Sequence, residues 1–373
     1  NFLNSSLTQA CETIGIQIGL PGLNWAIPIG ISFFTFQALG YLFDVYYKKI
    51  KAENNWWDYM LFICFFPQIA SGPISKARDL LPQIKNIRIF NYAKAVEGCK
   101  WLLWGMFLKV VVADRIGTLV DTILPNYIYQ NGTTCLAGAI LYSFQIYGDF
   151  AGYSFMAMGV GKVMGFDLIN NFQRPYFAPT ITEFWKRWHI SLTKWLTDYV
   201  YIPLGGNRCS KLKMYINILI TFLVSGIWHG ANWTYVIWGL IHGIIQSIEK
   251  ALGIQKCNKG NIKPFRILFT FILVTFAWIF FRMPSIQQGW DIICKIFTDF
   301  GDVSLSPKRT DNFFIIIGIL IIVIKEWFEE YHNSITLINN KYLFIRWSTY
   351  VILICMILLC GVFDAGSFIY VSF

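Results

Sequence analysis

The sequence has 373 residues, of which 55% are hydrophobic and only 14% are charged. Soluble domains carry roughly 25% charged residues, so this composition excludes an ordinary soluble protein. A net charge of +10 would suggest nucleic-acid binding in a soluble chain, but here the basic residues cluster between apolar stretches. That arrangement is typical of cytoplasmic loops in membrane proteins. We therefore expect a multi-pass integral membrane protein that binds no nucleic acid.

The first apolar stretch covers residues 23–43 and is followed by the basic cluster Lys48–Lys51. A second stretch, 59–75, contains two prolines and a glycine, which interrupt helices. Broken backbone is tolerated at membrane depth only against protein or a water-filled cavity. We therefore expect a kinked or re-entrant segment beside an internal cavity, followed by a polar surface helix and loop at 76–100.

Apolar stretches predict further membrane spans at 101–113, 122–148, 151–164, 267–281, 313–324 and 347–363. Residues 170–213 differ from these spans, because Trp and Tyr alternate there with charged residues, as at a membrane–water interface. Within this block, the apolar positions around His189 recur at helical spacing, which predicts an amphipathic helix at the interface.

A charge-free stretch of 35 residues, 214–248, lies between two basic clusters. One helix of that length would extend about 52 Å, whereas the hydrocarbon core is about 30 Å thick. Two shorter helices that meet near residues 228–232 fit better, and they return the chain to the same side of the membrane.

Four histidines are the main candidates for acid–base chemistry: His189, His229, His242 and His332. His229 lies in the middle of the charge-free stretch between Gly226 and Gly230, which leave space beside the imidazole. An ionisable residue at membrane depth indicates function, although a buried histidine that links two helices is the alternative. On spacing alone, His189 fits an interfacial helix, His242 has no evident pairing with His229, and His332 fits a solvated loop.

Several common chemical motifs are missing from the sequence. There is no G-x-S-x-G nucleophile elbow, H-E-x-x-H zinc motif, P-loop or G-x-G-x-x-G. The nine cysteines are scattered without a C-x-x-C pair. We therefore expect no metal site, no disulfide framework and no tightly bound cofactor.

The run from Arg174 to Arg208 contains Phe-Trp-Lys-Arg-Trp-His-Ile-Ser-Leu-Thr and ends in Ile-Pro-Leu-Gly-Gly-Asn-Arg. It resembles the signature block of membrane-bound O-acyltransferases, and more narrowly the branch that acetylates alginate. The segments 30–37, 67–74, 226–239 and 368–373 are similar to the same branch. The resemblance covers nearly the whole chain, so we expect one membrane domain over 1–373, with the signature block at 170–213 and a catalytic helical hairpin at 214–248. Members of the family usually begin further upstream, so we expect a truncated N-terminus.

The resemblance implies an all-α fold in which tilted and broken helices form a ring around a central tunnel. It also implies that His229 is the catalytic base and that His189 is a second catalytic histidine near the tunnel. A base that takes the proton of the attacking hydroxyl contributes roughly 10²–10⁴-fold to the rate. The neighbouring motif side chains are expected to contact substrate: Trp188, Ser191, Arg187, Trp228 and Asn232.

The implied reaction moves an acyl group, expected to be acetyl, from a cytosolic thioester such as acetyl-CoA or an acyl carrier to a hydroxyl acceptor. The expected outcome is O-acetylation of an extracytoplasmic polysaccharide at a bacterial plasma membrane, with membrane lipids and a separate extracytoplasmic acetyltransferase as partners. Two alternatives remain open. One is D-alanyl transfer to teichoic acid from a carrier protein. The other is a transporter, which should show two matching halves, whereas the Trp-His block occurs once.

Overall fold

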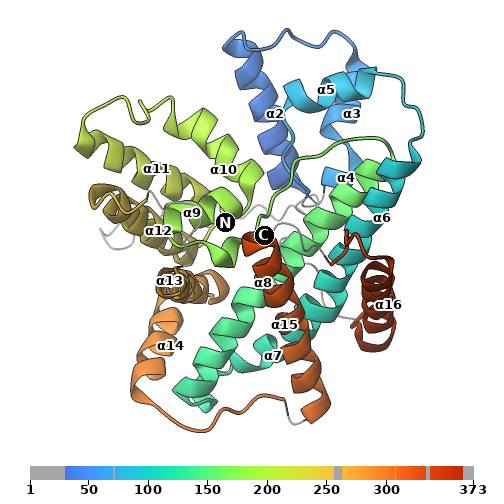
Figure 1. Cartoon of the computed structure of the whole chain (residues 1–373). Helices are drawn as coiled ribbons and strands as arrows, with labels where there is room; N and C mark the ends of the chain where they lie inside the picture. The colour runs from blue at the N-terminus through green and yellow to red at the C-terminus, as the bar shows by residue number, and fades with distance from the viewer. Residues whose placement is uncertain (1–29, 70–71, 256–262, 307, 333–336, 364–373) are drawn as a thin grey trace, which may run out of the picture.

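The computed structural model describes residues 30–69, 72–255, 263–306, 308–332 and 337–363. In this part of the chain all regular secondary structure is helical (Figure 1). The helices are α2 (Ile31–Tyr46), α3 (Trp56–Ile63), α4 (Phe66–Ile69), α5 (Ala77–Lys85), α6 (Tyr92–Met106), η1 (Phe107–Ala113), α7 (Asp114–Ile123), η2 (Tyr127–Tyr129), α8 (Gly132–Val163), η3 (Pro175–Phe177), α9 (Ile181–Arg187), α10 (Ile190–Leu196), η4 (Thr197–Tyr201), α11 (Lys211–His229), α12 (Trp233–Ala251), α13 (Pro264–Arg282), α14 (Ile286–Thr298), α15 (Arg309–Tyr331) and α16 (Leu343–Cys360).

Three of the described helices are long and apolar enough to cross a membrane: α11, α13 and α16. Many of their side chains are not covered by protein, especially in α16, where only 17% of the most apolar window is buried. An apolar surface of this kind is suited to lipid. The all-helical architecture and these three helices therefore fit a membrane protein.

The longest helix, α8, has 32 residues and packs against the rod formed by α6, η1 and α7 (Figure 1). Two glycine pairs allow this contact. A Cβ on Gly98 would lie 2.6 Å from the Gly159 carbonyl oxygen, and a Cβ on Gly105 would lie 2.6 Å from that of Gly152. Small residues at such positions let two membrane helices approach until their backbones touch.

The separate spans predicted at 122–148 and 151–164 are wrong, because one helix runs through both. The predicted boundary lay at Asp149, the charged residue that ends a charge-free stretch. In the structure a Cβ on Gly148 or Gly152 would lie 3.0 Å or less from a backbone oxygen, on Leu108 and Gly105 respectively. These glycines therefore serve close packing against α6 and η1, and α8 continues without interruption.

The interruption predicted within 59–75 is present. Helix α3 ends at Ile63, α4 is a single turn, and residues 72–76 are not helical. The Gln68 side chain donates to the Ser75 hydroxyl, which joins the two sides of the break. Of the first predicted span, residues 23–29 lie outside the described residues, and α2 begins at Ile31.

The later predicted spans correspond to observed helices. Residues 267–281 fall within α13, and 313–324 fall within the longer helix α15. Most of 347–363 falls within α16, which ends at Cys360. Helix α14 was not predicted. It is a short amphipathic helix that packs against α8 and α13, and its length is below that of a membrane span.

Candidate functional site

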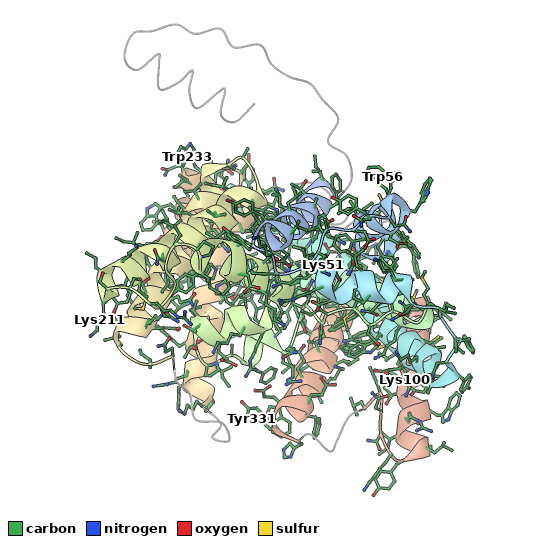
Figure 2. All side chains as sticks on the ribbon, turned by 90° about the horizontal axis from the view of Figure 1, so that it is seen from above. Lys51, Trp56, Lys100, Lys211, Trp233 and Tyr331 are labelled. Atoms are coloured by element: carbon green, nitrogen blue, oxygen red, sulfur yellow. The ribbon has the colours of Figure 1, made fainter. Side chains whose placement is uncertain are left out.

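The stretch 214–248 forms an antiparallel pair of helices, α11 and α12, whose connection at 230–232 falls where the sequence predicted it. Glycines bring the two helices together. A Cβ on Gly226 would lie 2.4 Å from the Tyr235 carbonyl oxygen, and a Cβ on Gly239 would lie 2.4 Å from that of Phe222. Figure 2 labels Lys211, the first residue of α11, at the left edge of the molecule and Trp233, the first residue of α12, at its upper left. The hairpin thus has a basic end and, at its other end, the loop 230–232 that connects the two helices.

His229 is the last residue of α11 and is 96% buried. The next residue, Gly230, has φ +154°, and a Cβ there would lie 2.6 Å from the Tyr235 ring. The imidazole is surrounded by aromatic rings, with centroid distances of 4.7 Å to Trp228, 4.9 Å to Trp238 and 5.1 Å to Phe281. These contacts place it in an apolar environment.

His189 connects α9 to α10, so the single amphipathic helix predicted around it is wrong. Its backbone is left-handed, with φ 44° and ψ 54°, a conformation that is rare for residues other than glycine. Asn171 stabilises this break, because its carbonyl accepts from Ile190 N at 3.0 Å and its side chain accepts from Ser191 N at 3.0 Å. Strain of this kind typically marks a functional position.

The His189 side chain is 99% buried, and neither ring nitrogen finds a hydrogen-bond partner in the described part of the chain. The ring packs edge-on against Phe150 at 4.6 Å and lies 6.0 Å from Trp228. Trp228 therefore contacts both His189 and His229, and Phe33 of α2 contacts Trp228 from another direction. Residues from three distant parts of the sequence meet at this point.

The other predicted contact residues are engaged within the protein. Ser191 Oγ accepts from Ile74 N at 3.0 Å, and Asn232 caps α12 while donating to the Pro284 carbonyl at 2.8 Å. Arg187 pairs with Glu183 and Glu330. Trp188 is 98% buried among aromatic rings. Among these motif residues, Trp228 contacts both histidines through its ring.

His242 of α12 is fully buried. Its spacing from His229 in the sequence did not indicate that it lies near the site. Because α12 runs antiparallel to α11, Trp238 lies between His242 and His229, with centroid distances of 5.2 Å and 4.9 Å. Trp185 of α9 packs edge-on against His242 at 5.1 Å. An antiparallel return of the chain was predicted, but the contacts of His242 with Trp238 and Trp185 were not.

A cavity of about 290 Å³ lies between the signature block and the helical hairpin. One part of its wall contains Ser225, which is one turn before His229 in α11, and Trp185. Another part contains Lys186 and Lys250. The cavity therefore extends from the basic end of the hairpin to Ser225 and Trp185, and its lining includes none of the buried histidines.

Glu249 fixes the wall of this cavity. Its carboxylate accepts from the backbone N–H groups of Ile181 and Thr182 at 2.6 and 2.8 Å, and from the Thr182 hydroxyl at 2.8 Å. A carboxylate at a helix N-terminus satisfies donors that the helix leaves free. The end of α12 thereby holds the start of α9.

The fold and site fit a helical membrane protein whose buried histidines lie among aromatic rings. Residues 46–288 match the model of the membrane-bound O-acyltransferase family. The chain is 41% identical over 314 residues to a probable alginate O-acetylase of Pseudomonas aeruginosa, covering 84% of this chain and 59% of that protein. The chain belongs to the membrane-bound O-acyltransferase family.

Two further relatives act on other polymers. A peptidoglycan O-acetyltransferase of Helicobacter pylori is 36% identical over 299 residues, covering 73% of this chain and 57% of the relative. A teichoic acid D-alanyltransferase of Streptococcus thermophilus is 30% identical over 231 residues, covering 58% of this chain and 55% of the relative. The chain thus spans a little under three fifths of the length of these curated relatives.

Proposed function

We propose that this protein is a multi-pass O-acyltransferase of a bacterial plasma membrane. It moves an acetyl group from a cytosolic thioester to a hydroxyl acceptor, for O-acetylation of an extracytoplasmic polysaccharide. The observation that carries the proposal is the convergence of His189 and His229 on Trp228, together with a cavity whose wall contains Lys186, Lys250 and Ser225, one turn before His229. Relatives named as alginate and peptidoglycan acetylases support the choice of acetyl.

The cavity is the donor's route in this proposal. Lys186 and Lys250 at its wall suit the phosphate groups that coenzyme A and acyl carriers share. In this proposal the thioester lies near Ser225, one turn before His229 in α11. In the complete protein, we propose that the helices enclose a tunnel that continues to the other face, where the acceptor enters.

The chemistry moves one proton from the acceptor hydroxyl to His229 and then to the departing sulfur. The acceptor hydroxyl oxygen attacks the thioester carbonyl carbon while the imidazole of His229 takes the hydroxyl proton. The carbon–sulfur bond then breaks, and the departing thiolate takes up the proton, which yields an ester and a free thiol. His189 has two ring nitrogens without partners in the described part of the chain, and it positions or polarises the donor carbonyl.

D-alanyl transfer is the second candidate, since teichoic acid D-alanyltransferases are among the relatives. Their identity of 30% is lower than the 41–43% of the alginate branch, which favours acetyl. The proposal is tested with the full-length protein in proteoliposomes, supplied with acetyl-CoA, an acetylated carrier or a D-alanylated carrier. Acetyl ester formation and thiol release support it, and turnover with the D-alanylated carrier alone would replace it with the second candidate.

The acceptor is identified separately. Deletion of the gene should remove O-acetyl esters from one envelope polysaccharide, measured by alkaline release of acetate from each purified polymer. Restoration by the wild-type gene is the control. An unchanged acetate content in every polymer would contradict a role in polysaccharide acetylation.

A further inference from the structure

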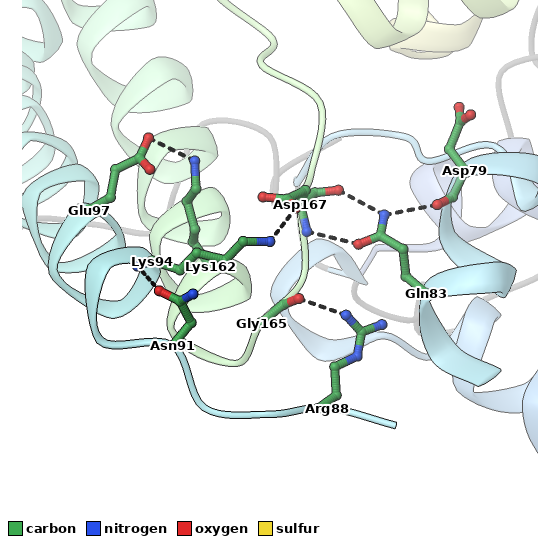
Figure 3. Close-up of polar contacts among 9 residues, drawn as sticks. All are labelled: Asp79, Gln83, Arg88, Asn91, Lys94, Glu97, Lys162, Gly165 and Asp167. Atoms are coloured by element: carbon green, nitrogen blue, oxygen red, sulfur yellow. Dashed lines mark hydrogen bonds and ion pairs between the residues drawn. The ribbon is translucent and has the colours of Figure 1, made fainter. Parts of the chain in front are cut away.

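A second pocket, of about 200 Å³, lies away from the histidines, between the segment 88–91, the start of α6 and the end of α8 (Figure 3). Three cationic side chains line it: Arg88, Lys94 and Lys162. Two carboxylates accompany them, because Lys94 pairs with Asp167 at 2.8 Å and Lys162 pairs with Glu97 at 2.7 Å. The group retains an excess of one positive charge.

Arg88 is the cation that no carboxylate neutralises in the described part of the chain. Its Nη1 donates to the Gly165 carbonyl at 2.6 Å, and its guanidinium lies 3.9 Å from the centre of the Phe166 ring. Its Nε and Nη2 atoms are shielded from solvent and meet no acceptor among the described residues. Buried N–H groups without acceptors are costly, so this guanidinium has unused capacity for an anion.

The walls of the pocket are held in place by the chain itself (Figure 3). Gln83 donates to the Asp167 carbonyl at 3.0 Å and accepts from Asp167 N at 2.9 Å. Gly165 has φ +86°, which favours glycine, and its turn directs a carbonyl to Arg88. The cationic group is therefore preorganised by α5, α6 and α8.

Apolar side chains surround the pocket on the outside. Ile87, Ile89, Phe90 and Tyr92 are 93%, 86%, 74% and 76% exposed, while Arg88 between them turns inward. Exposed apolar residues in such density indicate contact with a partner or a membrane. Aromatic and aliphatic residues beside cations are typical of the headgroup level of a bilayer.

The pocket lies at the same end of the helix bundle as the basic clusters. The opposite end of α8 begins at Gly132, whose N–H donates to the Asp299 carbonyl after α14. At that opposite end, Arg282, the last residue of α13, pairs with Asp121. Because α12 ends after Lys250 and α13 starts after Lys263, these two lysines and the pocket share one end of the bundle. The positive-inside rule makes this the cytoplasmic end.

We propose that this pocket binds the phosphate headgroup of an anionic phospholipid of the inner leaflet. The phosphate accepts from the guanidinium of Arg88 and lies near Lys94 and Lys162, and the acyl chains pass over Ile89 and Phe90. Arg suits this role because its planar fork matches phosphate oxygens. Basic pockets between membrane helices on the cytoplasmic side commonly hold lipid headgroups.

Native mass spectrometry of the full-length protein in detergent tests the proposal, with phosphatidylglycerol, phosphatidylcholine and soluble glycerol 3-phosphate as probes. We expect phosphatidylglycerol to remain bound at the collision energies that strip the detergent micelle and remove phosphatidylcholine. We expect glycerol 3-phosphate alone to bind weakly, because it lacks the chains that cover the apolar rim. Equal retention of the two lipids would contradict selectivity for an anionic headgroup. Binding of glycerol 3-phosphate as strong as that of phosphatidylglycerol would contradict a lipid as the source of the phosphate.

Variants then locate the site. Arg88→Gln should weaken phosphatidylglycerol binding by about tenfold, the loss of one charge-assisted contact. Arg78→Gln, at an exposed arginine of α5, is the matched control and should leave binding unchanged. Arg88→Lys keeps the charge and should bind at an intermediate level. Unchanged binding in Arg88→Gln would overturn the assignment, and the wild-type comparison of lipids decides the question even where that variant does not fold.

Discussion

The contact between α11 and α12 allows a quantitative prediction for Gly226→Ala. The added Cβ would lie 2.4 Å from the Tyr235 carbonyl oxygen, whereas ordinary contacts are at least 3.4 Å. The helices must therefore separate locally by about 1 Å, three residues before His229. Overpacking of this kind costs about 1–3 kcal/mol of stability. A misplacement of about 1 Å in a catalytic group reduces the rate by up to about 10²-fold.

The assay compares acetyl transfer per folded protein in wild type, Gly226→Ala and Gly253→Ala. Gly253 has φ +69° and no heavy atom within 4 Å of an added Cβ. Its replacement therefore costs about 1–2 kcal/mol through backbone strain without moving the hairpin. We expect similar losses of thermal stability in both variants, and a large loss of activity only in Gly226→Ala. Equal activities in the two folded variants would refute the link between hairpin packing and catalysis.

Three further substitutions test the surroundings of the site. Glu249→Gln should lower the melting temperature by weakening the charge-assisted bonds to Ile181 and Thr182, and it should raise KM by loosening the cavity wall, as measured by thermal unfolding and donor titration. Asn171→Ala should leave the protein folded but reduce kcat, because it releases the left-handed backbone of His189. A change in KM alone, measured on the folded variant, would contradict this. His242→Phe should retain most activity, since Trp238 lies between His242 and His229, and an inactive, folded variant would assign His242 a chemical role.

The family and the helical class were predictable because they depend on motifs and on the lengths of apolar stretches. The broken helix after Ile63 and the α11–α12 connection were predicted for the same reason, since glycine, proline and a 35-residue apolar stretch leave few alternatives. In both cases the local sequence determines where the helix is interrupted.

The errors have a common physical origin in tertiary contacts. The predicted break in α8 lay at Asp149, a charged residue that the structure accommodates inside the helix by pairing it with Lys109 of η1 at 2.6 Å. The break at His189 depends on Asn171, whose carbonyl and side chain capture two N–H groups 19 and 20 residues further on. The proximity of His242 to the site depends on helix register. The roles of His189 and His229 remain predictions.

The central claim is that His229 is the base for acyl transfer, and one comparison tests it most directly. Full-length His229→Ala and His332→Ala are purified in detergent and assayed for thiol release and ester formation from the acetyl donor. His332 ends α15 at an exposed position and is the matched control. We predict that His229→Ala loses at least about 10²-fold in kcat with an unchanged elution profile, while His332→Ala keeps wild-type activity. Near-normal turnover in His229→Ala would contradict the account.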